Sequence, residues 1–155
     1  MKIEVQVALS LKIPEVQKKL EQATREGLRD TIVAIHETAI DLSHKKTGHN
    51  ARSIASEVSG MGVVEKGSDA EPEHVVDDSK LESACYSTSG YGGYLEVGTD
   101  PHIITVKTAK VLTDGEDFFG KSVQHPGTDP YPYFRPALDM HKDKLTPNIK
   151  KHLEA

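Results

Sequence analysis

Apolar and polar side chains alternate at the beginning of the chain. Over residues 1–11 every second position is apolar, namely Ile3, Val5, Val7, Leu9 and Leu11. Successive side chains of a strand point to opposite faces, so a period of two is typical of a half-buried β-strand. We therefore predict a strand at the start of the chain.

After Pro14 the spacing of apolar residues changes to three and four, and this period continues to about Ser43. Proline is favoured in the first turn of a helix, because the N–H group that it lacks would have no partner there. One stripe contains Val16, Leu20, Ala23, Gly27, Leu28, Ile32, Ile35, Ala39 and Leu42. The pattern predicts an amphipathic helix of about 30 residues, roughly 45 Å long. We expect its apolar face to pack on a sheet, and Gly27 could introduce a bend.

Short apolar segments, separated by glycine and acidic residues, follow this helix. Residues 53–66 have apolar positions on both sides of a Gly-Met-Gly turn, which predicts a hairpin. The stretch from Lys66 to Lys80 is acidic and rich in turn-forming residues. We expect an exposed loop there, with a short strand at His74–Val76. Residues Ser83–Ser87 predict a further strand.

The next part of the chain predicts more short strands. A turn at Asp100-Pro101 precedes an apolar strand at residues 103–106. Residues 110–113 predict another strand that turns at Asp114-Gly115. We expect its partner to lie within residues 118–123.

A proline-rich loop, residues 125–134, leads to a C-terminal helix that we expect to begin at Pro136. One face of this helix carries Leu138, His141, Leu145, Ile149 and Leu153. Thr146-Pro147 marks either a kink or the start of a new helix. The order of elements predicts the α+β class, with a long N-terminal helix and a C-terminal helix packed on a small antiparallel sheet. The length favours one domain, residues 1–155.

The charge of the chain argues against one class of function. The formal net charge is −5, from 24 acidic and 19 basic residues. Proteins that bind nucleic acids tightly usually carry a basic surplus, because their affinity comes from neutralising phosphates. We therefore expect no tight binding of DNA, although an acidic protein can surround DNA without holding it. Aromatic residues make up only 5% of the chain and Trp is absent, so the fold could depend on partner subunits.

The cysteine content and the lack of long apolar runs indicate a reducing, aqueous compartment. A single cysteine, Cys85, excludes an internal disulfide. Cys85 lies in a predicted strand with no catalytic base near it in sequence, so we predict a buried apolar side chain rather than a nucleophile. No leader sequence opens the chain, and no apolar run approaches the ~20 residues that span a bilayer. We expect no membrane association.

Three separated elements contain unusual combinations of glycine, proline and aromatic residues. The first is Thr47-Gly48 followed by Arg52-Ser53-Ile54. The second runs from Tyr91 to Thr99 (YGGYLEVGT). The third begins with HPGT at His125 and ends with PYFRPAL at Leu138.

In order and spacing, over about residues 12–150, these elements resemble the neck proteins of long-tailed phages. Such proteins are variously labelled head–tail joining, tail-completion or gene-product-ten-like proteins. The resemblance implies a structural subunit of a phage or prophage, which forms a ring that joins head and tail. It implies contacts with other copies and with other neck and tail proteins, while DNA passes through the ring without specific binding. The expected location is the head–tail junction of the virion, and the host cytoplasm during assembly.

The matching elements supply the candidate motif and interface residues. These are Tyr94, Glu96, Gly98, Thr99, Pro126, Gly127, Tyr131, Phe134, Arg135 and Pro136. We expect a sharp turn at Gly98, because glycine alone enters positive φ without cost. The prolines fix φ along the third element and make it rigid. Tyr131 is a candidate for subunit contact, whereas Phe134 is expected to seal the base of the last helix.

Two further hypotheses concern charged and catalytic groups. Arg135 either pairs with Glu96, which would connect the second and third elements, or is simply exposed. His102, His125 and His141 show no metal-ligand spacing, and no nucleophile or phosphate-binding motif is present, so we expect neither catalysis nor a cofactor. The alternatives are a tail-terminator or tail-tube subunit and, less favoured, a small metal-dependent hydrolase.

Overall fold

The computed structural model describes residues 1–6 and 13–155. It confirms the α+β prediction, because a long N-terminal helix and a C-terminal helix pack on a small antiparallel sheet. Four antiparallel strands form the main sheet, in the order β1-β4-β2-β3. They are β1 (Lys2–Val5), β2 (Ile54–Val58), β3 (Gly62–Lys66) and β4 (Leu81–Ser87). The hairpin predicted over residues 53–66 is β2–β3, and the strand predicted over residues 83–87 belongs to β4. The predicted strand over residues 1–11 is confirmed at β1, whereas its positions Val7, Leu9 and Leu11 lie outside the described residues.

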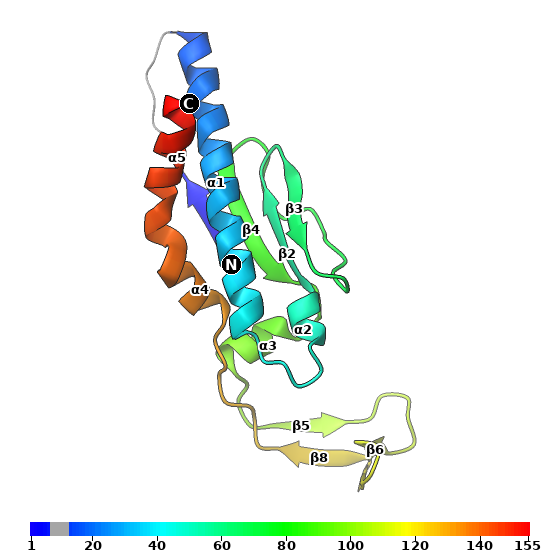
Figure 1. Ribbon diagram of the computed structural model, residues 1–155. Helices are drawn as coiled ribbons and strands as arrows, with labels where there is room; N and C mark the ends of the chain where they lie inside the picture. The colour runs from blue at the N-terminus through cyan, green and yellow to red at the C-terminus, as the bar shows by residue number, and fades with distance from the viewer. Residues whose placement is uncertain (7–12) are drawn as a thin grey trace.

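The long helix α1 (Pro14–Leu42) covers one face of the sheet (Figure 1). It begins at Pro14, as predicted, and the N–H of Ser43 donates to the carbonyl of Ala39 at 2.9 Å where it ends. Its central apolar residues Leu28, Ile32 and Ile35 are fully buried. They share the core with Ile54, Val58 and Cys85 of the sheet. The predicted apolar face therefore packs on the sheet over its central part, while Leu20 and Leu42 are only half-buried.

The C-terminal helix consists of three helical pieces that lie beside α1. These are α4 (Phe134–His141), a 3-10 turn (η1, Lys142–Lys144) and α5 (Leu145–Glu154). The prediction that the helix begins at Pro136 was wrong by two residues. It begins at Phe134, and Pro136 lies in its first turn, where a missing N–H is tolerated. Pro147 likewise occupies the first turn of α5, so Thr146-Pro147 marks a new helix.

Gly27 allows α1 and α5 to approach closely. A Cβ atom at this position would lie 2.5 Å from Cγ1 and 2.8 Å from the backbone nitrogen of Ile149. Next to this contact, the amide of Asn148 donates to the hydroxyl of Thr31 at 2.9 Å. The structural role of Gly27 is thus helix–helix packing.

The loop of residues 67–80 covers the second face of the sheet. Two fully buried carboxylates on that face accept backbone N–H groups of the loop: Glu57 accepts Val75 at 3.0 Å and Glu82 accepts Asp77 at 2.6 Å. His74 also hydrogen bonds to Glu57. The strand expected at His74–Val76 is not formed, because the N–H of Val75 is used by the Glu57 carboxylate rather than by a neighbouring strand.

Two small two-stranded sheets form a separate projection, residues 98–128, which we call the arm. Figure 1 shows the arm extending away from the main sheet and its helices, which we call the body. Its strands are β5 (His102–Thr105), β6 (Leu112–Thr113), β7 (Phe118–Gly120) and β8 (Ser122–His125). The β6–β7 pair confirms the predicted partner of residues 110–113. However, residues 118–123 do not form one strand, since Gly120 (φ 78°) turns the chain and β8 pairs with β5.

Candidate functional site

The three sequence elements meet at the end of the body from which the arm projects. The first element surrounds α2 (His49–Arg52), whose Asn50 is 2% exposed. The side-chain oxygen of Asn50 accepts hydrogen bonds from the hydroxyls of Ser87 at 2.7 Å and Ser89 at 2.9 Å. Its amide donates to the hydroxyl of Ser43 at 3.0 Å. Asn50 therefore links the end of α1, the end of β4 and the residues just before the second element.

Tyr133 of the third element is the largest fully buried side chain at this junction. Its hydroxyl donates to the carbonyl of Gly92 at 3.1 Å, and burial raises the pKa of that hydroxyl. Gly92 begins α3 (Gly92–Val97), and a Cβ atom there would lie 2.7 Å from the side-chain oxygen of Asn50. This position therefore requires glycine, because all three elements converge on it.

Glu96 of α3 connects the second and third elements through the backbone. Its carboxylate accepts the N–H groups of Tyr133 at 2.8 Å, Phe134 at 2.9 Å and Arg135 at 2.9 Å. These groups belong to the N-cap residue Tyr133 and to the first turn of α4, where N–H groups have no partner within the helix. Of the two alternatives for Arg135, the structure has the exposed side chain, since the guanidinium forms no ion pair with Glu96 or with any other residue among 1–6 and 13–155. The carboxylate does hold the two elements together, but as a helix cap.

The root of the arm consists of the remaining motif residues. Thr99 and Thr128 form a two-way backbone bridge, with N–H to carbonyl distances of 2.9 and 3.1 Å. Gly98 has φ 75°, as the expected sharp turn requires, and a Cβ atom there would lie 2.6 Å from the carbonyl oxygen of Thr128. Gly127 has φ 90° and faces the backbone of Thr99. Two glycines with positive φ and one bridge therefore fix where the arm leaves the body.

The other predicted residues of the third element lie on both sides of this root. Phe134 is 7% exposed and belongs to the core, as expected, and Tyr133 stacks against it with ring centroids 4.3 Å apart. Tyr131 is 49% exposed, and its ring meets that of His44 edge to face at 5.3 Å. Its N–H donates to the carbonyl of Leu95 at 2.7 Å, so its backbone is held while its ring remains accessible. Tyr94 on α3 is also exposed.

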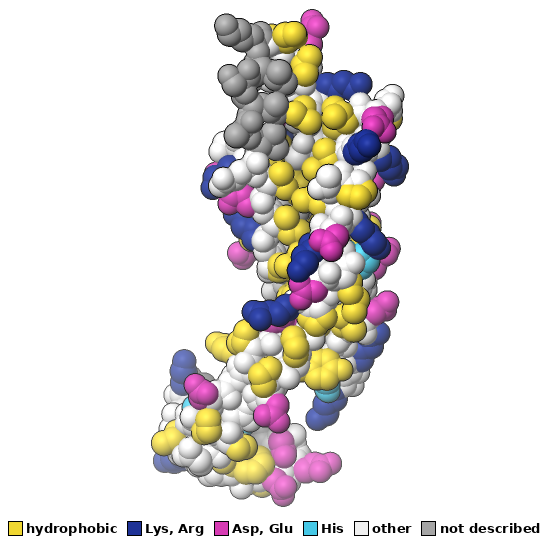
Figure 2. All heavy atoms as spheres, turned by 90° about the vertical axis from the view of Figure 1, so that its left-hand side faces the viewer, with side chains coloured by type: hydrophobic (Ala, Val, Ile, Leu, Met, Phe, Trp, Pro, Cys, Tyr) yellow, Lys and Arg dark blue, Asp and Glu magenta, His cyan; other side chains and the backbone are white. Residues whose placement is uncertain are grey.

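No side chain of the arm is buried. From Gly93 to Pro132 every residue is at least partly exposed, including Ile103 (65%) and Phe118 (78%). Figure 2 shows acidic and hydrophobic side chains together at the lower end of the molecule, where the arm lies. A small apolar cavity of about 320 Å³ lies between β5–β8 and the β6–β7 hairpin. The arm thus displays apolar surface instead of covering it.

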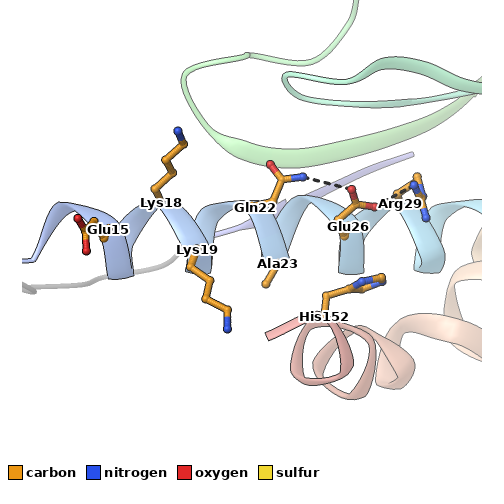
Figure 3. A pocket seen from close by; sticks show the side chains of 8 residues that line it. All are labelled: Glu15, Lys18, Lys19, Gln22, Ala23, Glu26, Arg29 and His152. Carbon is orange, nitrogen blue, oxygen red and sulfur yellow. Dashed lines mark hydrogen bonds and ion pairs between the residues drawn. The ribbon is translucent and has the colours of Figure 1, made fainter. Parts of the chain in front are cut away.

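A second hollow lies along α1, where α5 ends. It has a volume of about 750 Å³, and Figure 3 shows the side chains that line it. Glu26 pairs there with Arg29 at 2.9 Å and accepts a hydrogen bond from Gln22 at 3.2 Å. Some of the charged groups in the hollow therefore already have partners. Lys18 and Lys19 point away from each other in Figure 3. Such a lining is typical of a solvated helix surface and provides no convergent set of groups for a substrate.

The histidines do not form a three-ligand site. His102 and His125 face each other on paired strands, with ring centroids 5.0 Å apart, whereas His141 hydrogen bonds to Thr38 of α1 at 2.7 Å. Among residues 1–6 and 13–155, no three His, Cys, Asp or Glu side chains are grouped to hold a metal ion. Cys85 is fully buried, as predicted, and burial raises the pKa of its thiol to about 11. A thiol with this pKa is a poor nucleophile at neutral pH.

Sequence reasoning missed three buried polar groups that organise the structure, namely Asn50, Glu57 and Glu82. Asn50 lies inside the first element, between Gly48 and Arg52, and so could have been noticed. Glu57 and Glu82 occupy strands in which a charged residue normally faces solvent, and nothing in the local pattern distinguishes them.

Comparison with known proteins adds no relative to this description. No family model, curated protein or solved structure matches the chain. Within the described part of the chain, none of the helices has the length and apolar character needed to cross a membrane.

Proposed function

We propose that this protein is a ring-forming structural subunit of a tailed phage or prophage, which joins head and tail at the neck. In this role DNA passes through the ring without specific binding, and the protein has no catalytic site or cofactor. The proposal rests on the resemblance of the three sequence elements and on one structural observation. All three elements gather at the root of an arm that has no buried side chain.

The exposure of the arm supports an assembly role. Isolated two-stranded sheets are marginally stable in water, because they have no second layer to cover their apolar face. The arm nevertheless carries Ile103, Phe118 and Phe119 with 65%, 78% and 43% of their surfaces exposed. Large apolar side chains exposed on one small projection are a common feature of surfaces that become buried against another protein. Neighbouring subunits of a ring would provide that cover.

The construction of the root supports the same role. Gly98, Gly127 and the Thr99–Thr128 bridge fix the direction of the arm, and Glu96 fixes α3 to α4. A projection held in one direction loses less entropy on docking than a flexible one. A rigid root is therefore more useful for repeated contacts around a ring than for a simple connecting loop. The net charge of −5 is compatible with DNA passing through without being retained.

Shortening the arm tests the proposal. Residues 103–124 would be replaced by a short Gly-Ser turn, which keeps the root and the His102–His125 pair. We expect the body to melt as in the wild type, since none of the removed residues is buried. Negative-stain microscopy should show rings for the concentrated wild-type protein and none for the variant.

Other outcomes of this experiment distinguish the alternatives. Rings that still form from the shortened variant would contradict an assembly role for the arm. Long tubes of wild-type protein would favour a tail-tube subunit instead. A wild-type protein that remains monomeric and hydrolyses a substrate would favour an enzyme.

A further inference from the structure

A groove beside the root of the arm combines an apolar lining with a free positive charge. It lies between α3 and α4 and has a volume of about 490 Å³. Its apolar lining includes Val97, which is 69% exposed, together with Phe134 and Leu138. Arg135 also lines it. Met1 and the Glu96 carboxylate also line it. A mostly apolar lining with a few charged groups is a common composition for a binding groove.

The charges around this groove leave Arg135 available. The Glu96 carboxylate is occupied by three backbone N–H groups. Asp139, one helical turn after Arg135, pairs with Lys142 at 2.7 Å, and Arg135 adds only a weaker Coulombic attraction to it. Within residues 1–6 and 13–155, the Arg135 guanidinium has no ion pair. The groove therefore suits an occupant with an apolar side chain next to an acidic one.

The tip of the arm has this composition. The carboxylate of Asp114 accepts the N–H groups of Glu116 at 3.1 Å and Asp117 at 2.8 Å, which shapes the turn between β6 and β7. The side chains of Glu116 and Asp117 are exposed and form no ion pair within the described residues. Phe118 follows directly and is 78% exposed. The tip thus presents an aromatic ring beside two free carboxylates.

We propose that the tip of the arm of one copy inserts Phe118 into the α3–α4 groove of a neighbouring copy, with Glu116 and Asp117 facing Arg135. This inference rests on the proposed ring-forming function and identifies the two surfaces that form the ring contact. A tip cannot reach the groove of its own chain, since the groove lies beside the root and the tip lies at the far end of the arm (Figure 1). The contact joins two different surfaces, so it is heterologous, and repetition around an axis closes a ring.

Disulfide cross-linking tests the contact directly. The double variant V97C/D117C carries one thiol in the groove and one at the tip. Cys85 is fully buried and should not compete. Upon mild oxidation at high protein concentration, we expect a ladder of covalent dimers, trimers and larger oligomers. A mixture of the single variants V97C and D117C should give a covalent heterodimer only.

The matched control places the second thiol away from the groove. Val63 on β3 is 45% exposed, so V63C/D117C has a comparable accessible thiol on another surface. We expect little cross-linking of this variant. Equal yields for V97C/D117C and V63C/D117C would overturn the contact.

Charge reversal tests the predicted pairing in the V97C/D117C background, in which Glu116 is the carboxylate that remains to face Arg135. R135E should lower the initial rate of cross-linking by at least roughly tenfold, because it places like charges together and interface groups that matter contribute more than ~1.4 kcal/mol each. Adding E116K to R135E should restore much of the cross-linking rate. E116K without R135E should lower the rate. Circular dichroism of each variant establishes that the body remains folded. If R135E left the rate of cross-linking unchanged, the proposed pairing would be overturned.

The results separate this contact from the ring-forming function. Wild-type rings combined with control-level cross-linking would overturn the contact and leave the ring function intact. Cross-linking that stops at covalent dimers of V97C/D117C would indicate a mutual exchange of arms, and this outcome contradicts both the heterologous contact and the ring.

Discussion

The body and the arm use the same kinds of residues in opposite ways. In β2 of the body every residue is buried, including Glu57, whereas in β5 of the arm no residue is buried. Isoleucine illustrates the difference: Ile35 on α1 is fully buried and Ile103 on β5 is 65% exposed. The comparison shows two different uses of apolar residues in this chain. Those of the body form a buried core, and those of the arm remain exposed on the folded chain.

The largest effect is expected for identical substitutions of the two isoleucines. Ile35→Ala should lower the free energy of unfolding by about 2–5 kcal/mol, because it creates a cavity in the core. Ile103→Ala should change it by less than about 0.5 kcal/mol, because the side chain is exposed and has little packing to lose. Urea unfolding of the purified variants measures both values. A similar loss for both would show that the arm contributes to the stability of the monomer.

The junction between body and arm is tested by Glu96. Glu96→Ala leaves three N–H groups of Tyr133, Phe134 and Arg135 without their acceptor and should cost about 1.5–3 kcal/mol, the range of hydrogen bonds to charged groups. Glu96→Gln should cost less, since one oxygen acceptor remains. Glu116→Ala at the tip removes an acidic group that holds no such set of donors and serves as the control. Equal stabilities of the Ala variants at positions 96 and 116 would exclude the capping role.

A substitution at the root should separate the two regions. Gly98→Ala places a side chain at φ 75°, which costs roughly 1–2 kcal/mol, and its Cβ would lie 2.6 Å from the carbonyl of Thr128. We expect the Thr99–Thr128 bridge to weaken and proteases to cut within residues 98–128 faster than in the wild type. Gly93→Ala is the control, because nothing lies within 4 Å of a Cβ atom there. Unchanged proteolysis of Gly98→Ala would mean that the bridge does not anchor the arm.

The smallest effects concern pH and are expected within the body. Hydrogen bonding to Glu57 raises the pKa of His74 above its ordinary value of 6.5. The contribution of His74 to the stability of the folded state is therefore complete below pH 6.5. It is lost as the pH rises through the higher pKa that His74 has in the folded state. Burial lowers the pKa of His36, so the unfolded chain takes up this proton first, and stability falls as the pH decreases below 6.5.

Unfolding midpoints between pH 5 and 9 measure both contributions. His74→Gln should remove the loss of stability at alkaline pH and leave the stability at acidic pH unchanged. His36→Gln should flatten the acidic side. An alkaline loss that persists in His74→Gln would have to come from another group.

Local patterns were sufficient to predict most of the body. The stripe from Ala23 to Ala39 fixes one face of α1, and the Gly-Met-Gly turn fixes the β2–β3 hairpin, because both depend on neighbours in the sequence. The order of the strands could not be obtained in this way. It depends on the pairing of Lys2 with Ala84, two residues whose side chains contain no information about each other.

The candidate site was predicted in its residues but not in its contacts. Gly98 behaves as expected, since positive φ is a local property of glycine. The sequence placed Glu96 next to the correct element. Its partners could not be identified, because they are backbone N–H groups, which every residue except proline has. The projection of the arm was not foreseen, because alternating strands look the same whether their apolar side is covered by the same chain or by another one.

The cap formed by Glu96 has a consequence for the order of events on the ribosome. Translation proceeds from the N-terminus at about 5–20 residues per second, so the arm emerges before Tyr133, Phe134 and Arg135 exist. Until these residues are synthesised, the Glu96 carboxylate cannot accept their N–H groups. The carbonyl of Gly92 likewise lacks the hydrogen bond from the Tyr133 hydroxyl. A nascent or truncated chain that ends before Tyr133 would carry the arm without a fixed root. The arm would therefore reach its final direction only after synthesis of the segment that completes the body.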